Sequence, residues 1–336
     1  MILAGLFYIS SVLLGVFGAW VISFSARKLG LLDYPNERSS HSDPTPKGGG
    51  IGILVALIVG AFWWHIPLIF WMPACIVSFV SILGDYRDIS FKIRLSVQVG
   101  SAAIVSSLIF IVKSPSEVSV GFSVLLFILG VLSITATANC FNFMDGINGI
   151  AGLTGVIAFL CLGTFGLLEG KDHLPIAAAL GIAAACLGFL PFNFPRARVF
   201  MGDGGSVLLG FLFASWILWF SQSFLEFVVL TSFLFPFYVD EFSTQLIRIQ
   251  ERERLTKAHR RHIYQILVNQ AGLPHGIVTV IYGFIQIIVA VLAYLAMREG
   301  FLAVLSILVV LSAILFGGGL CIRRRWEGMI DVRIKE

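Results

Sequence analysis

Carboxylate side chains stand at the ends of long apolar segments, in positions where a membrane helix would begin or end. Asp85 follows one such segment, Asp145 and Asp203 each precede one, and Asp240 lies near the end of another. Ionisable groups near membrane depth are costly, and they usually serve a function or pair with one another. Each acid could also cap a helix N-terminus. Carboxylates gathered at one face would suit Mg²⁺, which prefers oxygen ligands and commonly takes one or two carboxylates together with substrate phosphates.

Basic side chains and glycines occupy the same polar segments. Lys and Arg do not bind metal ions, but they suit phosphate oxygens. Gly202, Gly204 and Gly205 surround Asp203 in "FMGDGGSVLLG", and a backbone without Cβ can approach a phosphate closely where a helix begins. Glycine also serves helix packing in membranes, so this turn alone does not identify a phosphate site. Together these residue types indicate a diphosphate bound by a metal ion and cations.

Apolar segments of membrane length must position these side chains. The chain has 336 residues, of which 58% are hydrophobic and 12% charged, and its mean hydropathy is +0.94. A membrane helix needs about 20 mostly apolar residues. We therefore predict an all-α polytopic membrane protein with about 11 transmembrane helices, forming one domain over residues 1–336. The expected spans are 3–24, 49–65, 67–84, 95–112, 120–138, 149–168, 175–191, 205–221, 224–244, 276–297 and 302–321.

The distribution of Lys and Arg predicts the orientation of these spans. Cytoplasmic loops of membrane proteins are enriched in Lys and Arg. With the N-terminus outside and the C-terminus cytoplasmic, 20 of the 23 Lys and Arg residues fall in inside segments. Fusing the second and third spans into one broken helix would reverse the second half of the chain and lose this asymmetry. The polar residues then lie in cytoplasmic loops, at 25–48, 85–94, 139–148, 192–204 and 245–275.

Five polar segments, in the order of the chain, read "DYPNERSSHSDPTPKGGG", "GDYRDISFKIR", "NCFNFMDGINGIAG", "FNFPRARVFMGDGGSVLLG" and "AHRRHIYQ". They resemble motifs of the polyprenyl-phosphate N-acetylhexosamine-1-phosphate transferases, which form glycosyltransferase family 4. The resemblance implies that a polyprenyl phosphate, usually undecaprenyl phosphate in bacteria, attacks the β-phosphorus of a UDP-N-acetylhexosamine and releases UMP. It also implies a multi-pass protein of the bacterial inner (plasma) membrane, with its active site facing the cytoplasm.

The resemblance assigns roles to individual residues. Asp203 resembles the principal ligand of Mg²⁺, or of Mn²⁺ in its place, and Asp85 resembles a second acid that orients or deprotonates the lipid phosphate. Because that phosphate is largely ionised near neutral pH, we expect Asp85 to position it. The expected catalytic residues are Asp85, Asp88 and Asp203, of which Asp203 and Asp85 would bind the metal. The expected substrate-binding residues are Lys47, Lys92, Arg94, Asn139, Asn142, Asp145, Asn193, His259 and His262.

Three departures from the family pattern bear on activity and specificity. Gly84 stands where the family usually has the first of two adjacent acids, and Asn148 stands where many relatives have a second aspartate. The segment "HRRHIYQ" replaces a run of three histidines. This form resembles the branch that initiates O-antigen and other surface glycans of the cell envelope, whose donors include UDP-GlcNAc, UDP-FucNAc and UDP-QuiNAc. A catalytically impaired relative is an alternative, since one acid is missing.

Other classes of protein share some of these features. A transporter or flippase of lipid-linked sugars would also have many helices and inner-face cations, but transporters place their sites near the midplane and often contain internal repeats, which this sequence lacks. CDP-alcohol phosphotransferases also use Mg²⁺ and intramembrane aspartates, but their DGxxAR-type motif is absent. The net charge of +4 follows from the predicted topology, so we expect no nucleic-acid partner. The resemblance allows a homodimer.

Overall fold

The computed structural model describes residues 2–35, 40–87, 89–113, 120–254 and 259–326. The helices are, in chain order, α1 (Ile2–Leu29), α2 (Ile51–Trp63), α3 (Leu68–Tyr86), α4 (Phe91–Lys113), α5 (Val120–Phe143), α6 (Ile150–Leu168), α7 (His173–Asn193), α8 (Asp203–Phe220), α9 (Phe224–Thr231), the 3₁₀ turn η1 (Ser232–Leu234), α10 (Phe235–Gln250), α11 (Ile263–Asn269), α12 (His275–Met297) and α13 (Phe301–Trp326). Two short strands, β1 (Leu32–Asp33) and β2 (Thr45–Pro46), pair in antiparallel fashion between α1 and α2.

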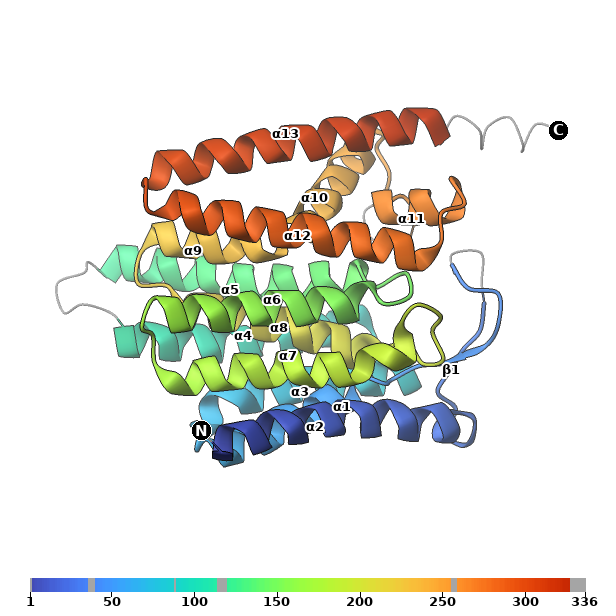
Figure 1. Cartoon of the computed structure of the whole chain (residues 1–336), viewed down its shortest axis with the longest axis horizontal. Coiled ribbons are helices and arrows are strands. Elements are labelled where there is room, and N and C mark those ends of the chain that lie inside the picture. The colour runs from blue at the N-terminus through green and yellow to red at the C-terminus, as the bar shows by residue number, and fades with distance from the viewer. Residues whose placement is uncertain (1, 36–39, 88, 114–119, 255–258, 327–336) are drawn as a thin grey trace.

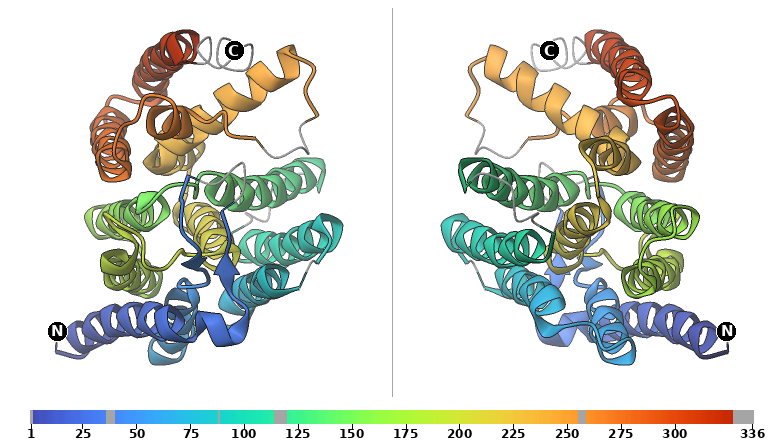
Figure 2. Two further views of the ribbon diagram at one scale, coloured as in Figure 1. Left: turned by 90° about the vertical axis from the view of Figure 1, so that its right-hand side faces the viewer. Right: turned by 90° about the vertical axis from the view of Figure 1, so that its left-hand side faces the viewer.

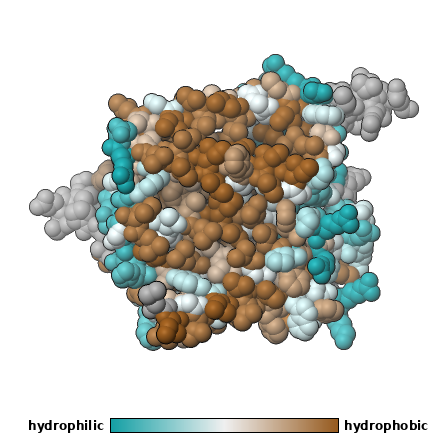
Figure 3. All heavy atoms as spheres, in the orientation of Figure 1, coloured by the Kyte–Doolittle hydropathy of each residue, from teal (hydrophilic) through white to brown (hydrophobic). Residues whose placement is uncertain are grey.

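The long helices lie side by side in one bundle, and the loops collect at its two ends (Figure 1). Apolar side chains form a broad band across the middle, with polar side chains at both ends (Figure 3). This arrangement is expected in a bilayer, where each helix satisfies its backbone polar groups internally. In the part of the chain that the structure describes, nine helices are long and apolar enough to cross a membrane. The prediction of an all-α polytopic membrane protein is therefore confirmed.

Two of the expected spans take a different form. The second, 49–65, is the 13-residue helix α2, which extends about 20 Å, less than the hydrocarbon thickness of about 30 Å. The ninth, 224–244, is divided into α9, η1 and α10, and α10 runs obliquely to the bundle (Figure 2). Pro236 lies in the first turn of α10, where its missing N–H lets a helix begin but not continue from the preceding one. The count of eleven spans and their orientation stay predictions.

Helix α8 forms the centre of the bundle. All of residues 204–217 are buried, and α2, α3, α4, α5, α6 and α9 pack around this helix. Helix α13 is the opposite case, because only 6% of its most apolar 18-residue window is buried within the protein. Since α8 is central, its first residue, Asp203, lies among the loops in the middle of one end of the bundle.

Backbone pairing between two distant loops organises this end. The N–H of Phe200 donates to the carbonyl O of Pro46 at 2.7 Å. The N–H groups of Gly48 and Gly49 donate to the carbonyl O of Phe200 at 3.1 and 2.9 Å. Strand β2 also pairs with β1. The segment after β2 is therefore fixed by β1 on one side and by Phe200 on the other. Lys47 therefore lies next to the start of α8.

Glycines let the backbones of α1 and α7 approach each other closely. A Cβ at Gly188 would overlap the carbonyl O of Val12, and one at Gly15 would overlap that of Ala185. We expect Gly188→Ala to push the helices apart and to lower the free energy of unfolding by about 1–3 kcal/mol, as overpacking does. Thermal unfolding in detergent measures this loss. The control is Gly5→Ala, since a Cβ there meets nothing within 4 Å; equal melting temperatures of the two variants would contradict the contact.

Candidate active site

A polar cavity of about 360 Å³ opens at the end of the bundle where α8 begins. The loop before α2, the ends of α3 and α5, the start of α8, helix α11 and the start of α12 contribute to its wall. Its lining residues are Asp33, Ser40, His41, Lys47, Asp85, Asn142, Asp145, Gly146, Ile147, Asn148, Phe200, Gly202, Asp203, Gln265 and His275. Five residues predicted from the sequence to form the site therefore meet here, namely Lys47, Asp85, Asn142, Asp145 and Asp203.

Two carboxylates and two cations meet at the start of α8, where Lys47, Asp85 and Asp203 line the cavity and Arg94 contacts Asp203. The backbone N–H of Asp203 donates to Asp85 Oδ2 at 3.0 Å. Arg94 Nη1 donates to Asp203 Oδ2 at 2.7 Å, and Lys47 Nζ lies 3.4 Å from Asp85 Oδ1. Each acid is thus paired with one cation, and the four residues come from four separate segments of the chain.

Gly202 allows Asp85 to reach the start of α8. Its φ is +78°, in the left-handed region that favours glycine. A Cβ at this position would lie 3.0 Å from Asp85 Oδ2 and 2.9 Å from the backbone N of Gly48. The sequence predicts that this glycine admits a phosphate, and the structure shows that a carboxylate of the protein already approaches it. A larger residue at 202 would separate Asp85 from α8.

Asn142 and Asp145 add an amide and a third carboxylate from the end of α5 and the turn after it. Ser206 Oγ donates to Asn142 Oδ1 at 2.8 Å, which ties this segment to α8. Burial raises the pKa of Asp145 to about 7, and the nearby charges of Asp203 and Asp85 add to the shift. The negative charge of the cavity would therefore be relieved by a bound cation.

The donor set of the cavity fits Mg²⁺. The carboxylates of Asp85, Asp145 and Asp203 line it, and hard oxygen donors are the ligands that Mg²⁺ prefers. Within the described ranges, no three Asp, Glu, His or Cys side chains form a complete metal-binding group. Bound Mg²⁺ would therefore use one or two of these carboxylates and rely on substrate oxygens for further positions.

Two residues predicted to bind substrate contact the protein's own backbone and side chains instead. Asn193 is 3% exposed; its Oδ1 accepts from the N–H of Gly149 at 2.8 Å, and its Nδ2 donates to the carbonyl O of Val199 at 2.9 Å. Asn139 Nδ2 donates to Gln98 Oε1 at 2.6 Å. Neither is among the described residues that line the cavity. Asn193 therefore joins the turn before α6 to the loop before α8.

The two predicted histidines lie behind the cavity wall. His262 is 2% exposed, with Nδ1 3.8 Å from Asp240 Oδ1 and Nε2 3.5 Å from Glu241 Oε2. The ring of His259 lies 4.9 Å from that of His262. Burial, with the charge of His262 as a second cause, lowers the pKa of His259 to about 4. His259 is therefore neutral near pH 7, and a role as a cation for phosphate does not suit it.

The first turn of α4 carries two predicted residues, of which one reaches the site. Arg94 reaches Asp203, whereas Lys92 is exposed in the first turn of α4. At 3.6 residues per turn, side chains two positions apart point in nearly opposite directions around a helix, so the same turn of α4 brings only one of them to the site. Asp88, predicted to be catalytic, lies outside the described residues.

The cavity wall also contains residues that the sequence interpretation did not select. His41 packs edge-on against Phe200, with 4.9 Å between ring centres, and its Nε2 lies 3.7 Å from Asp33 Oδ2. Gln265 and His275 complete this side. His41 and Gln265 stand within the quoted motifs, where their segments marked them as candidates. His275 lies in no motif, and only the fold brings it here.

The fold and the cavity together define a multi-pass membrane protein with a carboxylate and cation site at one end of its helix bundle. Such a combination suits phosphate groups and a divalent cation. Residues 67–221, from the start of α3 to the end of α8, match the glycosyl transferase family 4. This match, over a little less than half of the chain, supports the resemblance carried by its motifs.

Three relatives of known name are similar to the chain. The decaprenyl-phosphate N-acetylglucosaminephosphotransferase of Mycobacterium tuberculosis (strain ATCC 25618 / H37Rv) is 32% identical over 233 residues, which cover 62% of this chain and 58% of the relative. The chain therefore matches little more than half the length of that relative. The undecaprenyl-phosphate alpha-N-acetylglucosaminyl 1-phosphate transferase of Escherichia coli (strain K12) is 28% identical over 321 residues, 90% of this chain and 86% of the relative. The probable undecaprenyl-phosphate N-acetylglucosaminyl 1-phosphate transferase of Bacillus subtilis (strain 168) is 29% identical over 295 residues, 81% and 79% of the two chains.

The structure predicts how the protein would respond to an aspartate at position 84, where the family usually has an acid. A Cβ at Gly84 would lie 3.0 Å from Arg94 Cδ, and this flexible side chain can shift by the few tenths of an ångström required. We expect Gly84→Asp to fold and to keep its activity, because the new carboxylate would lie beside a guanidinium. Melting temperature and turnover, each compared with Gly84→Ala, measure the two effects. A folded but inactive Gly84→Asp protein, beside an active Gly84→Ala protein, would show that the site is adapted to a single acid.

Proposed function

We propose that the protein transfers an N-acetylhexosamine-1-phosphate from a UDP-sugar to undecaprenyl phosphate, giving undecaprenyl-diphosphate sugar and UMP. The observation that carries this proposal is the convergence of Lys47, Asp85, Arg94 and Asp203 at one end of a membrane helix bundle. The relatives named above act, by their names, on polyprenyl phosphates and N-acetylglucosamine. UDP-GlcNAc is therefore the first donor to test, and initiation of O-antigen or another surface glycan is the proposed role.

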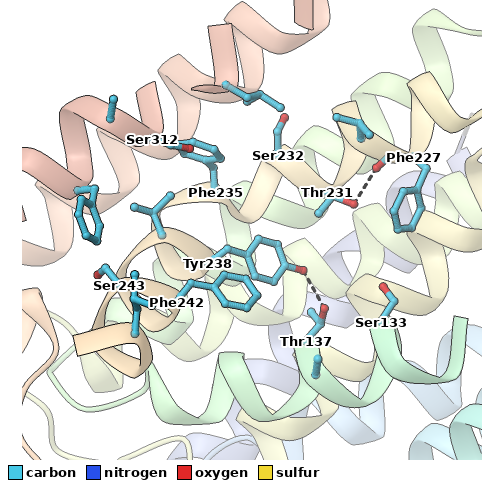
Figure 4. Close-up of a pocket in the computed structure, with 17 residues that line it drawn as sticks. Ser133, Thr137, Phe227, Thr231, Ser232, Phe235, Tyr238, Phe242, Ser243 and Ser312 are labelled. Carbon is cyan, nitrogen blue, oxygen red and sulfur yellow. Dashed lines mark hydrogen bonds between the residues drawn. The ribbon is translucent and has the colours of Figure 1, made fainter. Parts of the chain in front are cut away.

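An apolar groove that shares helix α5 with the polar cavity supports a lipid substrate. It encloses about 720 Å³ between α5, α9, α10 and α13 (Figure 4). Phe227, Phe235 and Phe242 line it, and the hydroxyls of Tyr238 and Thr137 form a hydrogen bond of 2.8 Å across it. Phe242 is 66% exposed, so the groove is accessible from the side of the bundle. A hydrocarbon chain could enter it from the bilayer.

The groove and the polar cavity share helix α5. Thr137 lines the groove and Asn142 lines the cavity, and five residues of helix span about 7.5 Å. Their side chains point to different sides of this helix, so a molecule with a long apolar chain and a phosphate head would have to pass around α5 to occupy both. These properties favour undecaprenyl phosphate as the acceptor.

The proposed reaction exchanges one phosphorus–oxygen bond for another. An oxygen of the acceptor phosphate forms a bond to the β-phosphorus of the UDP-sugar, and the bond from that phosphorus to the oxygen shared with UMP breaks. UMP leaves with this oxygen, and the sugar phosphate becomes part of a lipid diphosphate. Since the acceptor phosphate is already ionised, the protein's main tasks are to position the two phosphates and to compensate their charge.

The residues of the cavity suit these two tasks. Lys47 and Arg94, which pair with Asp85 and Asp203 in the structure, would contact phosphate oxygens of the bound substrates. Asp85, held by the N–H of Asp203, would orient the acceptor phosphate. When bound by Asp203 and Asp85, Mg²⁺, or Mn²⁺ in its place, would compensate the charge of the diphosphate.

The position of the cavity argues against a transporter or flippase. Transporters place their substrate sites near the middle of the membrane and reach them through discontinuous helices of two repeats. Here the charged cavity lies at one end of the bundle, beside the start of α8 and the end of α3. The divided span α9 to α10 lines the apolar groove and places no charged residue there.

The transferase proposal predicts that Asp203→Asn abolishes turnover. The purified protein in detergent, given undecaprenyl phosphate, Mg²⁺ and UDP-GlcNAc, should release UMP, and the variant should lose at least about 100-fold of this rate, as when one electrostatic group is removed from an active site. EDTA should abolish the activity of the wild type. Asp172→Asn, an exposed acid before α7 at the opposite end, is the matched control and should keep full activity. Full activity of Asp203→Asn would refute its assignment as metal ligand.

The raised pKa of Asp145 predicts a pH-dependent response to Mg²⁺. Because its pKa rises from 3.8 to about 7 on folding, the metal-free protein should lose stability as the pH increases over this interval. Bound Mg²⁺ would relieve the charge that forms, so it should raise the melting temperature more at pH 8 than at pH 6. Thermal unfolding without substrate, in Mg²⁺ and in EDTA, measures both effects. In Asp145→Asn the difference between the Mg²⁺ shifts at pH 8 and pH 6 should be smaller, and what remains should come from Asp85, whose pKa burial raises to about 6. A larger wild-type shift at pH 6 would contradict the prediction.

A further inference from the structure

Asp240 is a buried acid that the proposed reaction does not use. It lies in α10, is 2% exposed, and is not one of the described residues that line the polar cavity. Its Oδ1 accepts from the N–H of Ile263 at 2.8 Å, and its Oδ2 accepts from the N–H of Tyr264 at 3.3 Å. The hydroxyl of Tyr282, on α12, donates to Oδ2 at 2.6 Å. One carboxylate thus holds the first two residues of α11 and joins them to α10 and α12.

Arg323 connects the same carboxylate to α13. This side chain is 3% exposed, and its Nη2 lies 3.9 Å from Asp240 Oδ1 and donates to Thr244 Oγ1 at 2.7 Å. Its Nη1 donates to the carbonyl O of Arg261, two residues before α11. The opposite charges compensate each other where water is excluded. Four helices are therefore tied together at the start of α11.

Helix α11 in turn contacts the cavity wall. The hydroxyl of Tyr264 donates to the carbonyl O of Phe143 at 3.1 Å, and a Cβ at Gly146 would overlap that hydroxyl. Gln265, the next residue, lines the cavity itself and lies beside Gly146. The segment 143–146, which includes Asp145, is therefore packed directly under the first turn of α11.

We propose that Asp240 is a positioning residue, which fixes α11 by its backbone N–H groups and through α11 places the segment 143–146 in the wall of the cavity. The residue touches no substrate in this arrangement; it acts through Tyr264 and Gln265. Its effect on turnover rests on the proposed function, since this segment would contact the UDP-sugar. Its effect on the segment itself does not depend on any reaction.

The chemistry of the cluster suits positioning more than stability. A buried ion pair often stabilises a protein no more than apolar residues of the same size, because both charges must leave water. Its hydrogen bonds, however, have fixed lengths and directions. Asp240 uses both of its oxygens on N–H groups of one short helix, which fixes where that helix begins and how it is turned.

Three variants separate positioning from folding. Asp240→Asn replaces one acceptor oxygen by a donor, so the two N–H groups of α11 can no longer both be satisfied. Asp240→Asn combined with Arg323→Gln removes both charges and avoids an uncompensated buried guanidinium. Tyr282→Phe removes a single bond to Asp240 and is the mildest change. Glu226→Gln, which breaks the ion pair with Lys171 at the opposite end, is the matched control.

The first measurement is hydrogen exchange of the backbone amides in detergent, without substrates. We expect faster exchange in Asp240→Asn and in the double variant both at Ile263 and Tyr264 and within residues 143–146, a smaller increase in Tyr282→Phe, and none in Glu226→Gln at these sites. Faster exchange confined to α11, with residues 143–146 unchanged, would overturn the proposal. This result is independent of whether the protein releases UMP.

The second measurement is UMP release with varied concentrations of each substrate. We expect Asp240→Asn and the double variant to raise KM for the UDP-sugar on the order of 10-fold, the equivalent of one lost hydrogen bond to a charged group, with little change in KM for undecaprenyl phosphate. Recovery of the wild-type KM in the double variant would show that Asp240 only balances the charge of Arg323, and it would refute positioning. If the wild type releases no UMP, the transferase proposal fails while hydrogen exchange still decides the positioning of residues 143–146.

Discussion

A hydrogen bond from the backbone N–H of Asp203 to the carboxylate of Asp85 joins the start of the central helix to the end of α3. The rest of the polar end is arranged around the start of α8, because this helix is buried along residues 204–217. Backbone hydrogen bonds connect the loop that carries Lys47 to the residues just before α8. The position of α8 therefore also determines where Asp203, Asp85 and Lys47 lie at this end of the bundle.

Charge balance explains why these groups are found together. Arg94 pairs with Asp203 and Lys47 with Asp85, so two acids are compensated within the protein. Asp145 has no such partner among the ion pairs of the described chain, and its raised pKa reflects burial beside the other two acids. Substrate phosphates would draw the two cations toward themselves, and a divalent cation would then compensate the acids. In the proposed reaction the site would exchange internal ion pairs for contacts with its ligands.

The division of one span at Pro236 gives α10 two different roles. One face, with Tyr238 and Phe242, lines the apolar groove that suits a hydrocarbon chain. Another face carries Asp240, which holds the start of α11 and, through it, the wall of the polar cavity. A straight helix in this place would lie along the bundle and leave no oblique surface for the groove. The division of this span therefore contributes both to the groove proposed for the lipid and to the wall of the cavity proposed for the UDP-sugar.

The sequence by itself determined the helical membrane fold, the family resemblance and the choice of acids such as Asp203, because apolar segments of membrane length and short motifs consist of neighbouring residues. It did not determine which side chains face the cavity. Arg94 and Lys92 share a motif, yet only the rotation of α4 brings Arg94 to an acid 109 positions away. Asn193 likewise belongs to a motif, but packing directs its amide to two loops. Such choices depend on how helices turn and cross, and these are decided by contacts between residues that are distant in the chain.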